Sequence, residues 1–203
     1  MYKAIVTGAS SGIGKAIYEG LKKEGFETIG ISRHGPDHKI NVELPPSNWK
    51  KMFEDIDLLV NCAGIMPLYE GNPKKIFDVN FWGTYSMIQK TEFNKGACII
   101  NIASVSGVRP DPDLPIYAAS KAAVISLTKS LAKKCAPDIR VNCISPGFYK
   151  TNLVPGKIPQ EFIDTIPLGY AEQPQELMDV VMMIWNTKYL TGSNIIVDGG
   201  VSL

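Results

Sequence analysis

The sequence is poor in the residues that build metal and redox sites. It contains two histidines and four cysteines, and no two cysteines form a C-x-x-C pair, so neither a zinc knuckle nor a redox dithiol is indicated. Gly35 and Pro36 lie between His34 and His38, which argues against a metal-binding pair on a helix. We therefore predict no metal site.

The sequence also lacks an excess of one charge and any long hydrophobic run. Lys and Arg number 21 against 20 for Asp and Glu, which gives no reason to expect nucleic acid as a partner. The longest stretch without a charged residue, 96–108, is well short of the roughly 20 apolar residues that span a bilayer. No signal peptide precedes the first apolar run. We expect a cytoplasmic protein with no membrane partner and with reduced cysteines.

The composition is sufficient for one folded domain. The chain has 203 residues, of which 45% are hydrophobic and 20% charged, close to the averages of globular proteins. No repeat, low-complexity tract or linker interrupts it. We therefore predict a single domain over residues 1–203.

Short β-branched runs alternate with longer amphipathic stretches. The predicted strands are 3–7, 27–32, 39–42, 57–61, 97–103, 139–145 and 193–198, and the predicted helices are 13–24, 47–55, 73–94, 115–136 and 174–187. Most strand runs are apolar on successive residues, which is typical of strands buried on both faces. The alternation predicts an α/β fold, a Rossmann-like doubly wound parallel sheet of about seven strands with helices on both faces, in three α/β/α layers.

A glycine-rich turn, TGASSGIG at residues 7–14, joins the first predicted strand to the first predicted helix. Phosphate binding at such a place needs a tight turn, close approach of the backbone and free amides at the start of a helix. A glycine triplet by itself also occurs in purely structural turns, but its position between strand and helix favours dinucleotide binding. The predicted contacts are Gly8, Ser10, Ser11, Gly12, Ile13 and Gly14.

Further motifs follow in a fixed order along the chain. They are Asn61-Cys62-Ala63-Gly64 after the fourth predicted strand, Asn80 in DVNFWGT, Ser104 after the fifth strand, Tyr117 and Lys121 in YAASK, Pro146-Gly147 with Thr151, and the closing TGSNIIVDGG. Together with the glycine turn, they resemble the classical short-chain dehydrogenase/reductase family over residues 3–200. Cys62 departs from the pattern, because the family usually has a second Asn there. The resemblance implies hydride transfer between a nicotinamide cofactor and a carbonyl or secondary alcohol.

The Y-x-x-x-K pair supports this chemistry on physical grounds. Tyr117 and Lys121 are four residues apart and so share one face of a helix. The ammonium of Lys121 is expected to lower the pKa of the Tyr117 phenol, which then acts as general acid in reduction and general base in oxidation. Ser104 can hydrogen-bond the same substrate oxygen. The resemblance adds that Lys121 binds the nicotinamide ribose and that Asn80 holds a water of a proton relay. Each residue alone also has a structural explanation; their combination favours the catalytic one.

The end of the second predicted strand distinguishes the cofactors. Ser32 occupies the position where NAD-preferring relatives carry Asp, and the guanidinium of Arg33 suits a 2′-phosphate. We predict NADP(H), with use of NAD(H) as the alternative if Arg33 is only a solvated loop charge. The resemblance adds the remaining cofactor contacts: Asn41, Val42, Asn61, Ala63, Gly64, Tyr117, Lys121, Pro146, Gly147 and Thr151.

The substrate is less well defined. Three segments, 47–55, 64–80 and 148–174, are shorter than in most relatives, which suggests an open pocket for a small or carrier-bound carbonyl substrate. Likeness to the family's 3-oxoacyl-carrier-protein reductases suggests a 3-oxoacyl thioester by association only.

Two other functions fit the motifs less well than catalysis of hydride transfer. A non-catalytic NADP-binding sensor would not need Ser104, Tyr117 and Lys121 together, and an extended epimerase or dehydratase would be larger. The resemblance further implies a homodimer or homotetramer formed through the helices at 73–94 and 115–136, where Phe81, Trp82, Tyr85, Val124 and Leu127 are candidate core or interface residues.

Overall fold

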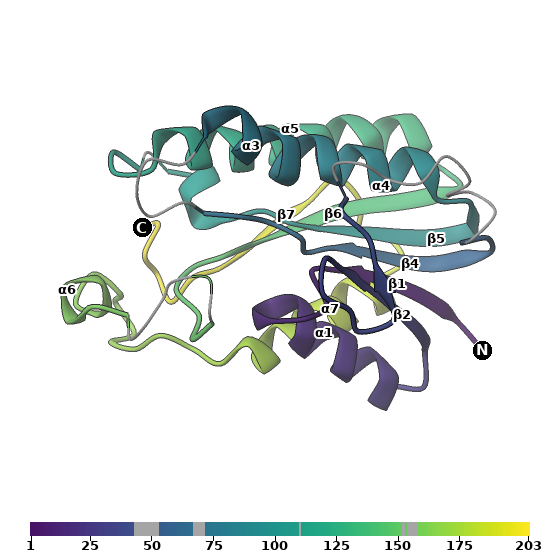
Figure 1. Ribbon diagram of the computed structural model, residues 1–203, viewed down its shortest axis with the longest axis horizontal. Helices are drawn as coiled ribbons and strands as arrows, with labels where there is room; N and C mark the ends of the chain where they lie inside the picture. The colour runs from purple at the N-terminus through teal and green to yellow at the C-terminus, as the bar shows by residue number, and fades with distance from the viewer. Residues whose placement is uncertain (43–52, 67–71, 110, 152, 154–157) are drawn as a thin grey trace.

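The computed structural model describes residues 1–42, 53–66, 72–109, 111–151, 153 and 158–203. Its strands form one seven-stranded sheet in the order β3-β2-β1-β4-β5-β6-β7, and every pairing is parallel (Figure 1). The strands are β1 (Lys3–Thr7), β2 (Glu27–Ser32), β3 (His38–Lys39), β4 (Ile56–Asn61), β5 (Phe93–Ile102), β6 (Ile139–Pro146) and β7 (Asn194–Val197). Because the strand order reverses between β1 and β4, the sheet is doubly wound, as the sequence predicts.

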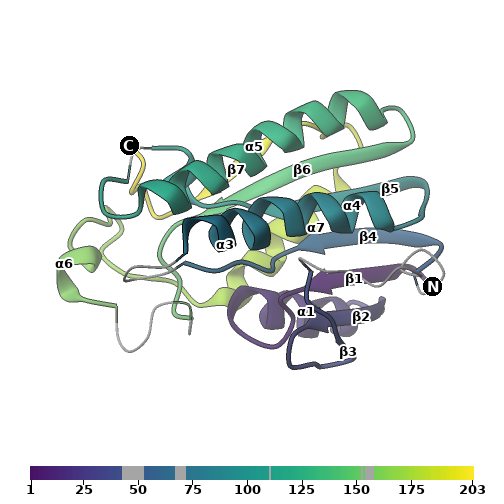
Figure 2. The same ribbon diagram turned by 45° about the horizontal axis from the view of Figure 1, so that its top comes forward.

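Helices cover both faces of the sheet. One face carries α1 (Gly12–Lys23) and α7 (Leu177–Asn186), and the other carries α3 (Pro73–Phe77), α4 (Thr84–Lys90) and α5 (Pro115–Cys135) (Figures 1 and 2). The shorter elements are a π-helix η1 (Asp78–Gly83), the 3-10 turns η2 (Val105–Gly107) and η3 (Pro174–Glu176), and α6 (Gln160–Ile163). The predicted three-layer α/β/α architecture is therefore confirmed.

Each helical layer packs on the sheet through its own apolar core. Ile17 and Leu21 of α1 are fully buried against strand residues such as Val6, in a core that α7 completes. The opposite core contains Leu59 and Met87. The strands are apolar on successive residues because both of their faces are covered.

One charged side chain, Arg140 on β6, is buried within this framework. Its guanidinium donates hydrogen bonds of 2.9–3.2 Å to the carbonyl oxygens of Ile184, Trp185, Thr187 and Leu190. These carbonyls belong to the end of α7 and the turn after it, where helix carbonyls have no partner within the helix and a positive charge is favourable. Arg140 thus fastens α7 to the sheet.

The helix predicted over 73–94 is wrong in its interior and at its end. The chain passes from α3 into the π-helix η1 and then α4, which ends at Lys90. The helix ends there because the backbone of Thr91 is extended, with φ of −100° and ψ of 134°, and the Thr91 hydroxyl donates a hydrogen bond of 2.7 Å to the carbonyl of Met87. Phe93 already pairs with Ile56, so β5 begins earlier than the predicted 97.

Three smaller predictions also need correction. The strand predicted over 39–42 is only the two residues of β3. Of the helix predicted over 47–55, residues 53–55 are not helical, since Asp55 has a φ of 59°, and 47–52 lie outside the described residues. The helix predicted over 174–187 begins with the 3-10 turn η3. The single-domain interpretation stays a prediction. No helix in the described ranges is long and apolar enough to cross a membrane.

Candidate active site

The predicted site residues gather at the carboxyl ends of β1, β4, β5 and β6. Thr7, at the end of β1, accepts hydrogen bonds of 3.0 Å on its hydroxyl from the amides of Cys62 and Ala63, just beyond β4. Lys121 of α5 donates 2.9 Å to the carbonyl of Ile102, at the end of β5. Ligands bind at this edge of open parallel sheets, near the point where the strand order reverses.

The glycine turn has the geometry that an anionic group requires. Gly8 and Gly12 have φ angles of 70° and 53°, which favour glycine. A Cβ on Gly14 would lie 2.3 Å from the carbonyl oxygen of Gly8, so the helix start can approach the turn closely only with glycine there. The N-cap residue Ser11 makes no side-chain capping bond, and the first turn of α1 has no acidic residue. The turn therefore fits a phosphate group of a dinucleotide.

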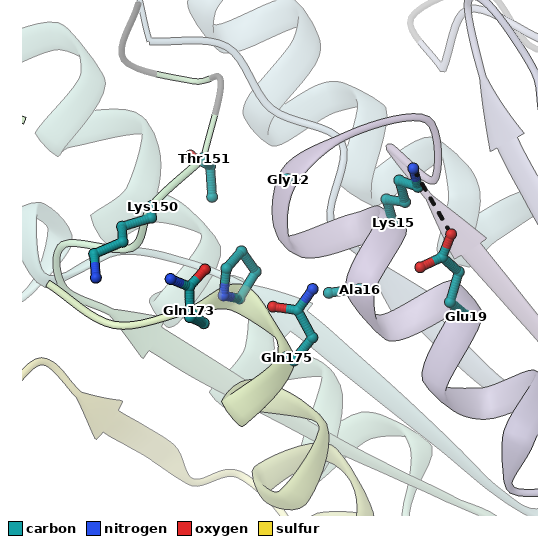
Figure 3. A pocket seen from close by; sticks show the side chains of 9 residues that line it. Gly12, Lys15, Ala16, Glu19, Lys150, Thr151, Gln173 and Gln175 are labelled. Atoms are coloured by element: carbon teal, nitrogen blue, oxygen red, sulfur yellow. Dashed lines mark ion pairs between the residues drawn. The ribbon is translucent and has the colours of Figure 1, made fainter. Parts of the chain in front are cut away.

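Thr151 lies directly against this turn. A Cβ on Gly12 would come within 3.3 Å of the Thr151 Cβ. A polar hollow of ≈ 220 Å³ opens beside the contact, between the start of α1 and the segment that leads into α7 (Figure 3). Its lining includes Lys15, which pairs with Glu19 at 3.8 Å, and Lys150. Thr151 is thus placed next to the predicted phosphate contacts.

Ser32 and Arg33 are arranged differently from each other at the end of β2. The side chain of Ser32 is buried and its hydroxyl donates to the carbonyl of Gly35, so Ser32 shapes the following turn. Arg33 is exposed, and no described carboxylate pairs with it. The guanidinium is therefore available to an external anion.

Asp37 is the one acidic residue in the segment 30–42, and its carboxylate is already engaged in hydrogen bonds within the protein. Its carboxylate accepts 2.7 Å from the amide of Gly30 and 3.1 Å from the hydroxyl of Tyr18. A hollow of ≈ 250 Å³ lies between this turn and the glycine turn, and Ser10, Lys15 and His34 contribute to its lining. Glu19 also lines this hollow but pairs with Lys15 at 3.8 Å, so neither Glu19 nor Asp37 offers a carboxylate without a partner among the described residues.

The cofactor contacts predicted after β3 and β4 differ in burial and in the groups that they contact. Val42 is buried against η1, since a Cβ on Gly83 would lie 2.8 Å from it, and Asn41 precedes it with partial exposure. Asn61 is buried and donates 2.9 Å to the Asn101 side-chain oxygen, while its own Oδ1 finds no donor among the described residues. A Cβ on Gly64 would lie within 3.3–3.4 Å of the Asn80 Oδ1 and the Lys121 Nζ.

The segment after β6 passes close to the last strand. The amide of Gly147 donates 2.9 Å to the carbonyl of Val197, and a Cβ on Gly147 would come within 2.7 Å of the Asp198 backbone. Pro146 is buried at the end of β6. These contacts direct the chain from β6 toward Thr151 and the glycine turn.

Tyr117 and Lys121 lie on one face of α5, as the spacing predicts. The Lys121 Nζ is 5.8 Å from the centroid of the Tyr117 ring, and both residues are buried, at 5% and 6% exposure for lysine and tyrosine. Ser104, also buried, follows β5 and caps the turn η2. The structure thus brings the three residues predicted to act on the substrate to one place.

The pKa of Tyr117 differs from the prediction. Burial raises the pKa of Tyr117 to about 12. Smaller effects come from the Ser104 hydroxyl, which lowers this pKa, and from Asp111 and Cys62, which raise it. Burial also lowers the pKa of Lys121 to about 8. In the chain alone the pKa shift of Tyr117 is therefore upward, opposite to the expected lowering, because burial removes the phenolate from water. The separate effect of the Lys121 ammonium stays a prediction.

Asn80 connects the segment after β4 to α5. Its Oδ1 accepts a hydrogen bond of 2.8 Å from the amide of Ile65. Its Nδ2 donates hydrogen bonds of 3.0 Å to the Ile65 carbonyl and to the Ser120 hydroxyl. Ser120 in turn donates 2.7 Å to the carbonyl of Tyr117. Asn80 lies in the π-helix, an element frequent at functional sites. The predicted role in holding water stays a prediction.

Sequence reasoning missed three neighbours of Tyr117. Ser120, on α5, accepts the hydrogen bond from Asn80, and Asp111 lies in the loop before α5. Burial raises the pKa of the Cys62 thiol to about 12, and the charge of nearby Lys121 partly offsets this increase. Cys62 packs against the apolar core but is only partly buried, whereas Cys98 and Cys143 are fully buried. The Asn-to-Cys departure was the available signal for Cys62; Asp111 belongs to no motif. Among the described residues, no group of His, Cys, Asp and Glu could hold a metal ion.

The sequence matches known proteins over nearly its whole length. Residues 46–202 match the family model described as enoyl-(acyl carrier protein) reductase. The chain is 30% identical to carbonyl reductase family member 4 of Danio rerio, covering 98% of each, and 31% identical to the 3-oxoacyl-[acyl-carrier-protein] reductase FabG of Aquifex aeolicus, covering 98% of this chain and 96% of the relative. It is 32% identical to an uncharacterized short-chain type dehydrogenase/reductase of Sinorhizobium fredii, of which it spans 43%.

Solved structures agree with these matches. The aldohexose dehydrogenase of Thermoplasma acidophilum is 31% identical, with a TM-score of 0.86 over 99% of this chain and 94% of the other. A 4-hydroxyisoleucine dehydrogenase in complex with NADH is 27% identical, with a TM-score of 0.87 over 100% and 99%. The chain belongs to the short-chain dehydrogenase/reductase family, NAD(P)-dependent oxidoreductases that act on CH–OH and C=O groups.

Proposed function

We propose that the protein is an NADP(H)-dependent reductase of carbonyl compounds in which Tyr117 is the proton donor. The observation that carries this proposal is the buried group of Tyr117, Lys121 and Ser104 at the sheet edge where the glycine turn also lies. The turn fits a dinucleotide phosphate, and the buried group fits a substrate oxygen.

Each residue has a role that follows from its position. When bound, the cofactor supplies the hydride that adds to the carbonyl carbon. Tyr117 donates its proton to the carbonyl oxygen, which becomes the alcohol, and the resulting phenolate lies near the Lys121 ammonium. The Ser104 hydroxyl stabilises the charge that develops on the same oxygen. A proton from solvent then restores the phenol, and Asn80 is placed to support its path.

The protonation state of the chain supports reduction as the direction for which it is prepared. With a pKa of about 12, the Tyr117 phenol holds its proton throughout the neutral range. A general acid must be protonated at the start of the reaction, which is the case here for carbonyl reduction. Oxidation of an alcohol needs the phenolate, which the positive charge of an oxidised nicotinamide would favour.

The preference for NADP(H) is supported by the residues around the end of β2. Arg33 is exposed without a described carboxylate partner, whereas Asp37 is held by Gly30 and Tyr18. A 2′-phosphate gains charge-assisted hydrogen bonds from a guanidinium, and a ribose 2′-hydroxyl would need a free carboxylate. The 4-hydroxyisoleucine dehydrogenase relative binds NADH, so the preference depends on these local residues and not on the family.

The substrate is proposed to be a small or carrier-bound carbonyl compound. The relatives named for 3-oxoacyl-[acyl-carrier-protein] and carbonyl reduction support a β-ketoacyl thioester or a simple ketone. Phe148 and Phe162 pack with ring centroids 5.6 Å apart and offer an apolar wall. Residues 67–71, 152 and 154–157 lie outside the described ranges, so the open pocket stays a prediction.

The function is tested by following NADPH absorbance across ketones, β-ketoacyl thioesters and aldoses. We expect consumption of NADPH with at least one carbonyl class and formation of the corresponding alcohol. Tight NADPH binding with no turnover of any compound would instead favour the NADP-binding sensor.

We also propose a homodimer or homotetramer. Phe77, Phe81, Trp82 and Tyr85 form an aromatic ridge with successive centroid distances of 6.5, 4.9 and 6.2 Å, and Trp82 is 54% exposed. Val124 is instead part of the buried interior, and Leu127 packs on the core. Light scattering should give a dimeric or tetrameric mass, and Trp82→Glu should shift it toward monomer because a buried charge opposes association. A monomeric wild-type chain would refute the assembly.

A further inference from the structure

The loop between η2 and α5 is closed by one carboxylate, that of Asp111. The Ser106 hydroxyl donates a hydrogen bond of 2.7 Å to the Asp111 Oδ2, and the amide of Leu114 donates one of 3.2 Å to the Asp111 Oδ1. The Leu114 amide also donates 3.3 Å to the Asp111 carbonyl. Asp111 therefore holds both ends of its loop at once.

The two ends of this loop carry the groups that act on the substrate. At one end, the amide of Ser106 donates 3.2 Å to the Ser104 hydroxyl oxygen. At the other end, Leu114 is the N-cap residue of α5 without a side-chain capping bond, and its carbonyl accepts 2.9 Å from the amide of Ala118, next to Tyr117. The Asp111 carboxylate thus accepts from the amide of the N-cap residue itself, as the acidic residue of a capping box does, at the end of the helix where a negative charge is favourable.

The turn η2, from which this loop starts, is packed tightly onto α5. A Cβ on Gly107 would lie 2.7 Å from the Ala122 amide nitrogen and 3.0 Å from the Lys121 Cβ. Movement of η2 would therefore be transmitted directly to the helix that carries Lys121. Together with the tethers of Asp111 to Ser106 and Leu114, this packing restricts the separation of Ser104 and Tyr117.

We propose that Asp111 is a positioning residue of the active site, whose carboxylate holds the Ser104 turn and the start of α5 in the arrangement that carbonyl reduction uses. The proposal rests on the proposed reductase function. Asp111 touches neither Ser104 nor Tyr117 by any described hydrogen bond, so it acts through Ser106 and Leu114.

The charge of Asp111 has a second effect, on proton transfer. The groups that influence Tyr117 are the Ser104 hydroxyl, the Cys62 thiol, the Lys121 ammonium above the ring, and Asp111. Asp111 is half-buried, no described basic side chain pairs with it, and its negative charge raises the pKa of Tyr117. The carboxylate therefore favours the protonated phenol that donates to the substrate.

The experiment compares Asp111→Asn and Asp111→Ala with Asp113→Asn, an exposed acid of the same loop for which the described residues show no hydrogen bond. The kcat and KM of reduction are measured with NADPH and the carbonyl compound that the wild-type chain reduces fastest. The kcat of the reverse oxidation is measured with NADP⁺ from about pH 6 to about pH 10, because the positive nicotinamide favours the Tyr117 phenolate and lowers its pKa. NADPH affinity, from the fluorescence of the reduced nicotinamide, shows that each variant is folded and able to bind.

Asp111→Asn removes the charge, so the acidic limb of the oxidation profile, which reports formation of the Tyr117 phenolate, should move to lower pH, by on the order of half a unit. Asp111→Ala removes both tethers and should lower kcat roughly 10-fold to 100-fold with little change in NADPH affinity. Asp113→Asn should match the wild type. A merely structural role would lower kcat without moving the limb.

Two results separate this inference from the function on which it rests. If Tyr117→Phe is inactive but the Asp111 variants have the wild-type profile and kcat, the positioning role is wrong and the reductase function stands. If Tyr117→Phe stays active, or no carbonyl compound is reduced, the proposed function fails and the positioning role fails with it.

Discussion

Tyr117→Phe is expected to lower the kcat of carbonyl reduction by roughly 10²-fold to 10⁴-fold, the usual contribution of a general acid. The substitution removes only the hydroxyl from a buried ring, so packing around Ser104 and Lys121 is kept. The substrate oxygen then lacks the proton that must accompany hydride addition. The measurement is steady-state NADPH consumption, together with NADPH affinity, which should change little.

Tyr149→Phe is the matched control for this prediction. Tyr149 is also buried, and its hydroxyl makes only a 3.5 Å contact with the carbonyl of Val197. Surrounding carboxylates and burial raise its pKa as well, so a raised tyrosine pKa does not by itself identify the proton donor. Equal losses in the two variants would mean that the defect is one of folding, and an active Tyr117→Phe would exclude Tyr117 as the donor.

Arg33→Ala is expected to raise the KM for NADPH by roughly 10-fold to 100-fold and to leave the KM for NADH nearly unchanged. A hydrogen bond to a charged group contributes about 1.5–3 kcal/mol, and only NADPH carries the 2′-phosphate that Arg33 would bind. Because the side chain is exposed, the effect should weaken as the salt concentration rises. The ratio of kcat/KM for NADPH to that for NADH measures the change.

Lys39→Ala tests whether Arg33 acts by contact or by charge alone. Lys39 is exposed in β3, within the same segment, and its substitution removes the same unit of charge. A contact predicts that only Arg33→Ala lowers the preference for NADPH. Equal effects of both variants would indicate a diffuse field, and a wild-type preference for NADH would exclude the role of Arg33 altogether.

The fold was largely predictable because its strands are buried on both faces. Runs such as residues 3–7 and 57–61 have apolar residues at successive central positions, and the structure places β1 and β4 there within one residue at either end. The prediction failed where the backbone changes conformation within an amphipathic stretch. Nothing in the periodicity of residues 73–94 indicates that the backbone becomes extended at Thr91 or that η1 is a π-helix.

The site residues were predictable where chemistry restricts the residue type. Gly14 must lack a side chain because a Cβ would meet the Gly8 carbonyl, and Tyr117 and Lys121 must be four residues apart to share a helix face. The protonation of Tyr117 was not predictable in this way. It depends on how much water the fold removes from the phenol, and burial is the largest cause of its raised pKa.

What the sequence alone determined is the class of reaction, because the glycine turn and the Tyr117–Lys121 pair are recognisable from residue types and spacing. Only the tertiary structure decided which further groups surround Tyr117. Asp111 and Cys62 belong to different loops, and neither follows a spacing rule with Tyr117; they meet it because β4, β5 and α5 converge at one edge of the sheet.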